Sequence, residues 1–369
     1  MVLPLPYPMN VTFLVPPSTP LAPSPDLTSA ISIQELEAFP LKVTPPFWIV
    51  AFVTKPKTTR AWDCDTIFSK IPGNHSEIWD FTYIHSLVVG IHHSDLDSTL
   101  LNPRYRNLLD TPDAYGRTPL FWAALRGDLS KVATLLAAGA DHSKTDLEKR
   151  LPLHAAIQSG SVRCVEILLR RGSSVHARDN YGNTALQIAT FSDDNEAMLE
   201  TLYLAGASVN ATEQYGTSVL ASAACLNHPK SANWLIQKGA DIESLDVVGY
   251  SPLLEAIRYC NAEVAEALLR HGARVDLNTK GGRTVLHVLA STGNLAGTNV
   301  LLQFPLPGLS TEIRDSKGMT ALQIFENRVG PPDGMQEAFF KLLHHINSRS
   351  ESEDNEEDVF VDAVASLTV

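Results

Sequence analysis

The sequence predicts an all-α fold made of stacked helix–turn–helix units. Three observations predict it: an acidic or hydroxyl residue recurs about every 33 residues, a glycine almost always follows it three positions later, and a pair of large apolar residues precedes a second glycine. A fixed period of this length is typical of repeat arrays, in which each unit buries its apolar face against its neighbours. A chain of 369 residues with 44% apolar residues is long enough for one such array.

The period is set by one slot that occurs seven times. The slot holds Asp113, Asp146, Asp179, Glu213, Asp246, Thr279 and Asp315, at separations of 33, 33, 34, 33, 33 and 36 residues. Glycine follows three positions later at Gly116, Gly182, Gly216, Gly249, Gly282 and Gly318. Lys149 is the exception. Aspartate oxygens accept nearby backbone N–H groups and glycine tolerates a positive φ, so we expect a tight turn at the start of every unit.

The unit that begins at Asp113 shows how two helices follow the turn. In the segment Thr118–Leu120, threonine can cap a helix and proline is tolerated in its first turn. Gly127 ends this helix. Leu135 and Leu136 then place apolar groups on one face of a second helix, and Gly139 suits the left-handed turn after it.

Short strings at the helix starts resemble ankyrin repeats. They are Thr118–Ala124 (TPLFWAA), Leu153–Ala156 (LHAA), Thr184–Leu186, Ser251–Leu253, Thr284–His287 and Thr320–Leu322. The resemblance implies an ankyrin-repeat α-solenoid whose β-turn fingers project at right angles to the helices. It also implies that His154 and His287 are structural, with rings that hydrogen-bond backbone between units, and are not catalytic.

The resemblance covers about 77–346, the expected ankyrin-repeat domain. A degenerate opening unit is expected at 77–112, repeats near 113, 146, 179, 213, 246 and 279, and a degenerate C-terminal cap from 315. The string Thr82–Gly90 resembles the segment that precedes ankyrin arrays in filamentous-fungal proteins. Terminal units are expected to be atypical because they shield the core from water.

The flanks differ in composition from the array. Residues 1–46 hold eleven of the 23 prolines and few charges, which predicts disorder. Residues 47–76 include Trp48 and Trp62 and are too apolar for a free linker; they either cover the first repeat or are a remnant of a lost domain. Residues 347–369 form an acidic tail, in which 351–369 carry seven acidic residues and no Lys or Arg.

Composition and motifs exclude several functions. The formal net charge of −12 makes nucleic-acid binding unlikely. The four cysteines, Cys64, Cys164, Cys225 and Cys260, form no C-x-x-C pair, so we expect reduced thiols in an intracellular protein of the cytoplasm or nucleus. No secretion signal, membrane-spanning run or catalytic signature is present. We therefore expect a monomer that is not an enzyme, without cofactor, metal or small-molecule substrate, and with a protein as partner.

The family's partners usually lie on the concave face, at six offsets in each unit. Of the 42 positions that these offsets select, ten are basic and one, Glu148, is acidic; the whole-chain frequencies of 29 basic and 41 acidic residues in 369 would give about three and about five. The basic residues are Arg117, Arg126, Arg150, Arg178, Arg258, Lys280, Arg283, Arg314, Lys317 and Arg328. Six positions are aromatic. Tyr and Arg dominate binding hot spots.

The predicted function is a scaffold or adaptor that binds a protein, with an acidic surface, in this groove. The predicted protein-binding residues are Tyr115, Arg117, Arg126, Arg150, Arg178, Tyr181, Phe191, Tyr215, Tyr250, Arg258, Tyr259 and Arg283. A structural interpretation competes for Arg117, Arg150 and Arg283, because their offset is often basic for reasons of turn geometry. The alternatives are a regulatory or targeting fragment of a larger multidomain protein and, less favoured, nucleic-acid binding. The acidic tail either folds back on the groove or is a free solubilising extension.

Overall fold

The computed structural model describes residues 80–192, 194–328 and 330–348. The expectations for 1–46, for 47–76 and for the tail beyond 348 lie outside these residues. Within them the secondary structure is helical and contains no strand, only the isolated bridges Thr212–Ser218 and Arg314–Thr320. The prediction of an all-α solenoid is confirmed.

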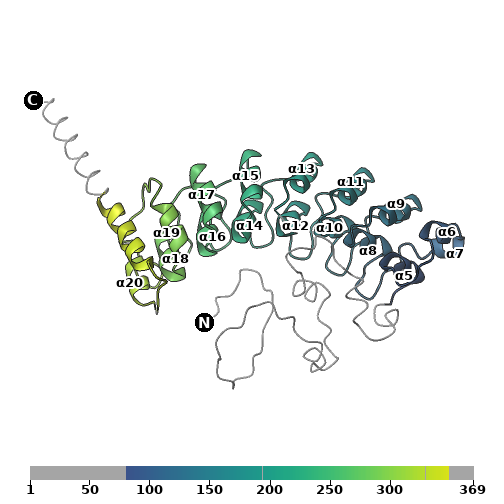
Figure 1. Ribbon diagram of the computed structural model, residues 1–369, viewed down its shortest axis with the longest axis horizontal. Helices are drawn as coiled ribbons and strands as arrows, with labels where there is room; N and C mark the ends of the chain where they lie inside the picture. Colours follow the sequence, from purple (N-terminus) through teal and green to yellow (C-terminus); the bar gives the residue numbers. More distant parts are fainter. Residues whose placement is uncertain (1–79, 193, 329, 349–369) are drawn as a thin grey trace, which may run out of the picture. The chain divides into compact units, whose positions relative to one another are not determined.

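The helices form two rows (Figure 1). The first row consists of α5 (Tyr83–Val89), α8 (Pro119–Leu125), α10 (Pro152–Gln158), α12 (Ala185–Ser192), α14 (Val219–Leu226), α16 (Pro252–Arg258), α18 (Val285–Thr292) and α20 (Ala321–Glu326). The second row consists of α9 (Leu129–Ala137), α11 (Val162–Arg170), α13 (Glu196–Leu204), α15 (Pro229–Gln237), α17 (Ala262–Arg270) and α19 (Leu295–Leu301). Two short helices, α6 (Leu96–Leu100) and α7 (Pro103–Arg106), follow α5, and a helix over 335–348 follows α20.

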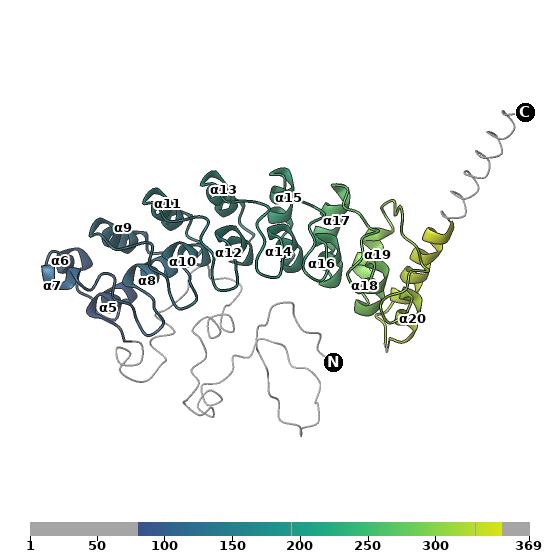
Figure 2. The ribbon, with the colours of Figure 1, turned by 180° about the vertical axis from the view of Figure 1, so that it is seen from behind.

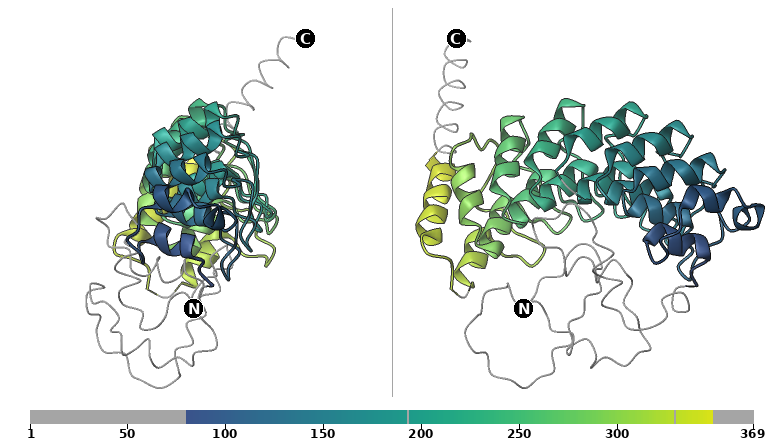
Figure 3. Two further views of the ribbon diagram at one scale, coloured as in Figure 1. Left: turned by 90° about the vertical axis from the view of Figure 1, so that its right-hand side faces the viewer. Right: turned by 45° about the vertical axis from the view of Figure 1, so that its right-hand side comes forward.

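Each helix packs on its partner in the same unit and on the equivalent helix of the next unit. Figure 2 shows the same two rows of helices from behind. Leu120, Leu135, Leu153 and Leu168 are fully buried between the rows. Seen along the stack, the turns between units project on one side of the helices (Figure 3), so the sequence period becomes a spatial row of turns.

Polar caps fix where the first-row helices begin. Thr118 Oγ1 accepts the N–H of Phe121 at 3.3 Å. In the unit of α18, His287 Nδ1 accepts the N–H of Thr284 at 3.2 Å, and Nε2 donates to the carbonyl of Met319 in the next unit at 3.1 Å. This confirms the expected structural role of His287, because one ring joins two units.

The equivalent positions of α10 and α12 form the same cap within their unit. His154 Nδ1 accepts the N–H of Leu151 at 3.2 Å, and burial lowers the pKa of His154 to about 4, so the ring is neutral at pH 7. Its buried Nε2 has no hydrogen-bond partner among the described residues, so the expected bond of His154 to the next unit is not made. In α12, the amide of Gln187 donates to the carbonyl of Thr217 in the next unit at 2.9 Å, so this site can be satisfied without histidine.

Candidate protein-binding surface

Each unit begins with a finger, which we define as the turn made by the slot residue and the four residues after it. At Asp179, Oδ1 accepts the N–H groups of Tyr181 and Asn183, both at 2.9 Å. Gly182 has a φ of 79°, and a Cβ on it would lie 2.9 Å from the backbone nitrogen of Gln214 in the next finger. Glycine is therefore required both by the turn and by the close approach of the neighbouring finger.

Backbone hydrogen bonds connect successive fingers into a ladder. Leu147 N donates to the carbonyl of Tyr115 at 3.0 Å, and Gln214 N donates to that of Tyr181 at 3.1 Å. The same contact recurs between Val247 N and Tyr215 O at 2.9 Å and between Lys280 N and Val248 O at 2.8 Å. The ladder holds the finger tips in one register, so side chains at the same offset lie in a row.

The row of tips exposes large apolar side chains. We define the tip ridge as Leu147, Tyr181, Tyr215, Leu245, Val247 and Val248, whose exposed fractions are 69%, 41%, 40%, 49%, 50% and 49%. Two of these, Tyr181 and Tyr215, are predicted binding residues. The four aliphatic residues also lie at positions selected by the six offsets, with Leu245 directly before its finger. They were missed because only basic, acidic and aromatic residues were considered at those positions. An apolar patch of this kind on a protein surface is typical of an interaction site.

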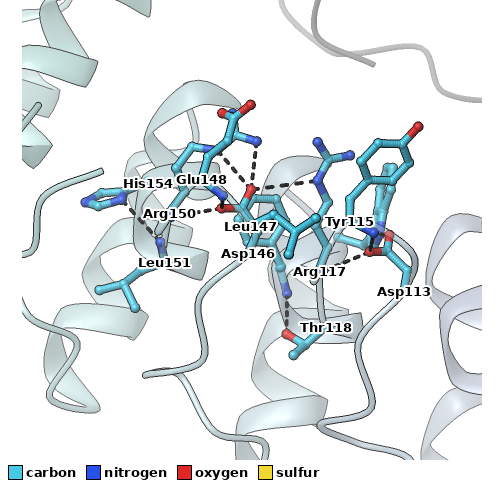
Figure 4. A network of polar contacts seen from close by, with 12 residues as sticks. Asp113, Tyr115, Arg117, Thr118, Asp146, Leu147, Glu148, Arg150, Leu151 and His154 are labelled. Carbon is cyan, nitrogen blue, oxygen red and sulfur yellow. Dashed lines mark hydrogen bonds and ion pairs between the residues drawn. The ribbon is translucent and has the colours of Figure 1, made fainter. Parts of the chain in front are cut away.

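Arg117 and Arg150 are buried, with exposed fractions of 4% and 7%, so their predicted role in binding does not fit the structure. Figure 4 shows them around Asp146. Arg150 Nη2 donates to Asp146 Oδ2 at 2.7 Å, Arg117 Nε lies 3.9 Å from the same oxygen, and the Arg117 guanidinium stacks 5.1 Å from the ring centre of Tyr115. Arg150 also pairs with Glu148 at 3.2 Å. Arg117 therefore links its finger to the next one through Asp146, and Arg150 braces its own finger.

The remaining predicted arginines lie nearer the surface. Arg178 is exposed and donates to the carbonyls of Gly182 and Thr212, both at 2.6 Å. Arg283 is about one-third exposed and lies 3.8 Å from Asp315. Arg126 is half-buried, at the end of α8.

A cluster of predicted residues lies around the end of α16. The Arg258 guanidinium lies 4.8 Å from the ring centre of Tyr250 and 5.5 Å from that of Tyr259. It is also 3.6 Å from the carboxylate of Glu255, which is only 2% exposed. Phe191 is half-buried at the corresponding position of α12, and Tyr115 is half-buried under Arg117. The structure brings Tyr250, Arg258 and Tyr259 into one contact.

Glu255 was not singled out from the sequence. Its position in the unit is occupied elsewhere by apolar or small residues, such as Ala155, Ile188 and Val288. Burial raises the pKa of Glu255 to about 7, against the opposing effect of Arg258. Burial also raises the pKa of Cys225 in α14 well above its ordinary value, so this thiol is not activated as a nucleophile.

The C-terminal fingers are basic. We define the basic end as Lys280, Arg283, Arg314 and Lys317. Lys280, Arg314 and Lys317 are exposed, and within the described part of the chain none of these three is ion-paired. Arg314 donates to the carbonyl of Gly318 at 2.9 Å. These three side chains can therefore bind an acidic group of a partner.

Comparisons with known proteins agree with this geometry. A family profile described as "Ankyrin repeats (3 copies)" matches residues 120–213 and 194–279. The ankyrin repeat domain of human ASB11 superposes with a TM-score of 0.54 at 26% identity, covering 61% of this chain and 98% of that one. Residues 120–279 match ankyrin repeats, and the described array has the ankyrin-repeat fold.

Two curated relatives are longer proteins. Mouse inversin is 30% identical over 204 residues, which are 53% of this chain and 19% of inversin. The mouse B-cell lymphoma 3 protein homolog is 25% identical over 224 residues, which are 58% of this chain and 49% of that protein. The chain therefore matches about a fifth to a half of the relatives' lengths, and their whole-protein activities do not transfer to it.

Ankyrin-repeat domains mediate protein–protein interaction and are not themselves enzymes. Within 80–192, 194–328 and 330–348, no group of three or more His, Cys, Asp or Glu side chains is arranged to hold a metal ion. None of the helices in these ranges is long and apolar enough to cross a bilayer.

Proposed function

We propose that this ankyrin array is a scaffold that binds an acidic protein partner on its finger side. The observation that carries the proposal is the tip ridge, an exposed apolar row in fixed register that continues into the basic end. The only acidic residue at the predicted offsets, Glu148, is already paired with Arg150. Apolar tips supply contact area, and the basic end selects against partners of positive charge.

A variant of the finger tips and a control variant of the second row test the proposal. Leu147 on a finger is 69% exposed, and Leu204 on α13 in the second row is 76% exposed. A triple variant, Leu147→Ser with Tyr181→Ser and Tyr215→Ser, removes apolar area from three fingers. We expect it to weaken binding of a partner identified by in-cell cross-linking by at least about tenfold, since hot-spot residues each contribute more than about 1 kcal/mol.

Leu204→Ser is the control and should leave the affinity within about twofold. Affinities are measured by calorimetry with purified proteins after circular dichroism has verified that each variant is folded. Equal loss in the finger variant and in the control, or no loss in either, would reject the finger side as the binding surface.

A second candidate is a targeting or regulatory array within a larger polypeptide. It is favoured by the relatives, in which the matched region is only part of a longer chain. Binding by the array would then serve to place another domain near the partner. Sequencing of the full-length transcript tests it, and a transcript that encodes no further domain would contradict it.

A further inference from the structure

The finger side of the array is polarised along its length. The tip ridge begins at Leu147 and ends at Val248, and the basic end begins at Lys280 and continues to Lys317. The ladder is unbroken across the boundary, because Lys280 N donates to Val248 O at 2.8 Å and Ser316 N donates to Gly281 O at 2.8 Å. A segment that follows the tips from the C-terminal end therefore meets cations first and apolar side chains afterwards.

The last described helix is hydrogen-bonded to the segment just before the last finger. Thr311 Oγ1 donates to Asn347 Oδ1 at 2.9 Å, and Thr311 lies three residues before Arg314, just ahead of the last finger. Ser348 follows Asn347 and is the final described residue. Residues 349–369 follow Ser348 directly in the sequence, and Asn347 is held to the segment that leads into the last finger.

The sequence of this segment has the same order of chemistry as the surface. Its acidic residues come first, at Glu351, Glu353, Asp354, Glu356, Glu357 and Asp358, and the apolar run Val359–Val361 follows. Ten residues, 349–358, extend to about 33 Å at about 3.3 Å each. Neighbouring packed helices are about 8–10 Å apart, so an extended stretch of this length is long enough to reach from the last finger to the finger of Val247 and Val248, two units away.

We propose that residues 349–369 dock along the finger side of their own array. Their carboxylates lie against Lys317, Arg314 and Lys280, and Val359–Val361 cover the end of the tip ridge at Val247 and Val248. The inference rests on the proposed function, because the segment occupies part of the same surface. It also specifies the partner, which must displace the segment and so carries an acidic stretch beside an apolar one.

The full-length chain tests the proposal with a fluorescein-labelled peptide of residues 349–369 as the probe. The peptide is titrated with the unaltered chain and with the double variant Phe360→Ser, Val361→Ser. Tethering gives the chain's own segment a high effective concentration, so it competes with the probe. We expect the variant to bind the peptide on the order of tenfold more tightly than the unaltered chain, as 1:1 complexes.

Four further measurements, each made in the double-variant chain, separate the contacts. Lys317→Ser should weaken peptide binding at about 0.05 M NaCl but not at about 0.5 M, because salt screens exposed charges. Val248→Ser should weaken it at both. Leu204→Ser, on the second row, should change neither. A peptide of the same composition with the apolar half placed first should bind more weakly than the natural order.

Equal peptide affinity for both chains, or no binding to either, would overturn the docking while leaving the partner experiment with the finger variants unaffected. A concentration-dependent dimer of the unaltered chain in sedimentation, lost in the double variant, would also overturn it, because the segment would then occupy a second copy. If the finger variant loses partner binding but the peptide does not bind, the proposed function stands and the docking of residues 349–369 is rejected.

Discussion

Lys149 is the residue at which the turn pattern of the array is broken. It stands where six other fingers have glycine, and it adopts the left-handed conformation with a φ of 58°. This conformation is about 1–2 kcal/mol unfavourable for a residue with a Cβ, whereas glycine adopts it without this penalty. Because Lys149 is exposed, its side chain offers no packing in return.

We therefore expect Lys149→Gly to raise the free energy of unfolding by about 1 kcal/mol, seen as a higher midpoint in urea. The converse change, Gly182→Lys, is the control. It should destabilise by more than about 1 kcal/mol, because a Cβ there would lie 2.9 Å from Gln214 N. Unchanged stability in Lys149→Gly would show that the left-handed turn carries no strain.

Glu255 gives the array a pH dependence whose sign follows from its raised pKa. The folded pKa is about 7 against an ordinary 4.5, so the stability that this group contributes is full below pH 4.5 and is lost as the pH rises through 7. Cys225, Asp246 and Arg258 are the groups that face it. Because a tenfold change in proton affinity corresponds to about 1.4 kcal/mol, the loss totals about 3 kcal/mol.

We expect Glu255→Gln to be more stable relative to the unaltered chain at pH 8 than at pH 5, by on the order of 2–3 kcal/mol. Because the two proteins share all other titratable groups, the contributions of those groups to the free energy of unfolding cancel when the proteins are compared at one pH. One of these is His154, whose lowered pKa of about 4 acts in the opposite direction and removes stability as the pH falls from 6.5. A difference between the two proteins that does not vary with pH would show that Glu255 ionises normally.

At the scale of the element, helix pairs derive their stability from packing in both directions along the stack. Leu168 in α11 and Leu342 in the last helix are both fully buried. Leu168 lies between α9 and α13, whereas the last helix has no described unit beyond it. A central defect therefore weakens two interfaces, and a defect at the end weakens one.

We expect Leu168→Ala to lower the free energy of unfolding by about 2–5 kcal/mol, and Leu342→Ala to lower it by less. Chemical denaturation followed by helical circular dichroism measures both. Small and equal effects would contradict the packing of the second row.

At the scale of the whole molecule, stability should be greatest in the middle of the array. Units in a repeat array are stabilised by their own contacts and by those with nearest neighbours, so end units open first. We expect backbone amides of α10 to α14 to exchange with solvent more slowly than those of α5 and of 335–348, by hydrogen exchange followed by mass spectrometry. Uniform protection along the array would indicate one cooperative unit instead.

The sequence by itself determined the repeating parts of this protein. The slot at Asp179, the glycine at Gly182 and the cap at Thr184 act within a few residues of each other, so their spacing predicts the turn and the helix start without knowledge of the neighbours. The role of His287 was expected from the resemblance to ankyrin repeats and not from local spacing, because its bond to Met319 crosses to the next unit.

Only the tertiary structure decided which side chains at one offset reach the surface. Arg117, Arg150 and Arg283 occupy equivalent positions, yet the first two are buried around Asp146 beside Tyr115, and Arg283 is about one-third exposed. Aromatic rings make the difference. Tyr115 and Trp122 cover the guanidinium of Arg117, and Phe121 of the preceding unit lies 5.9 Å from that of Arg150. Burial of Glu255 likewise depends on α14, so its pKa is a property of the stack and not of the residue.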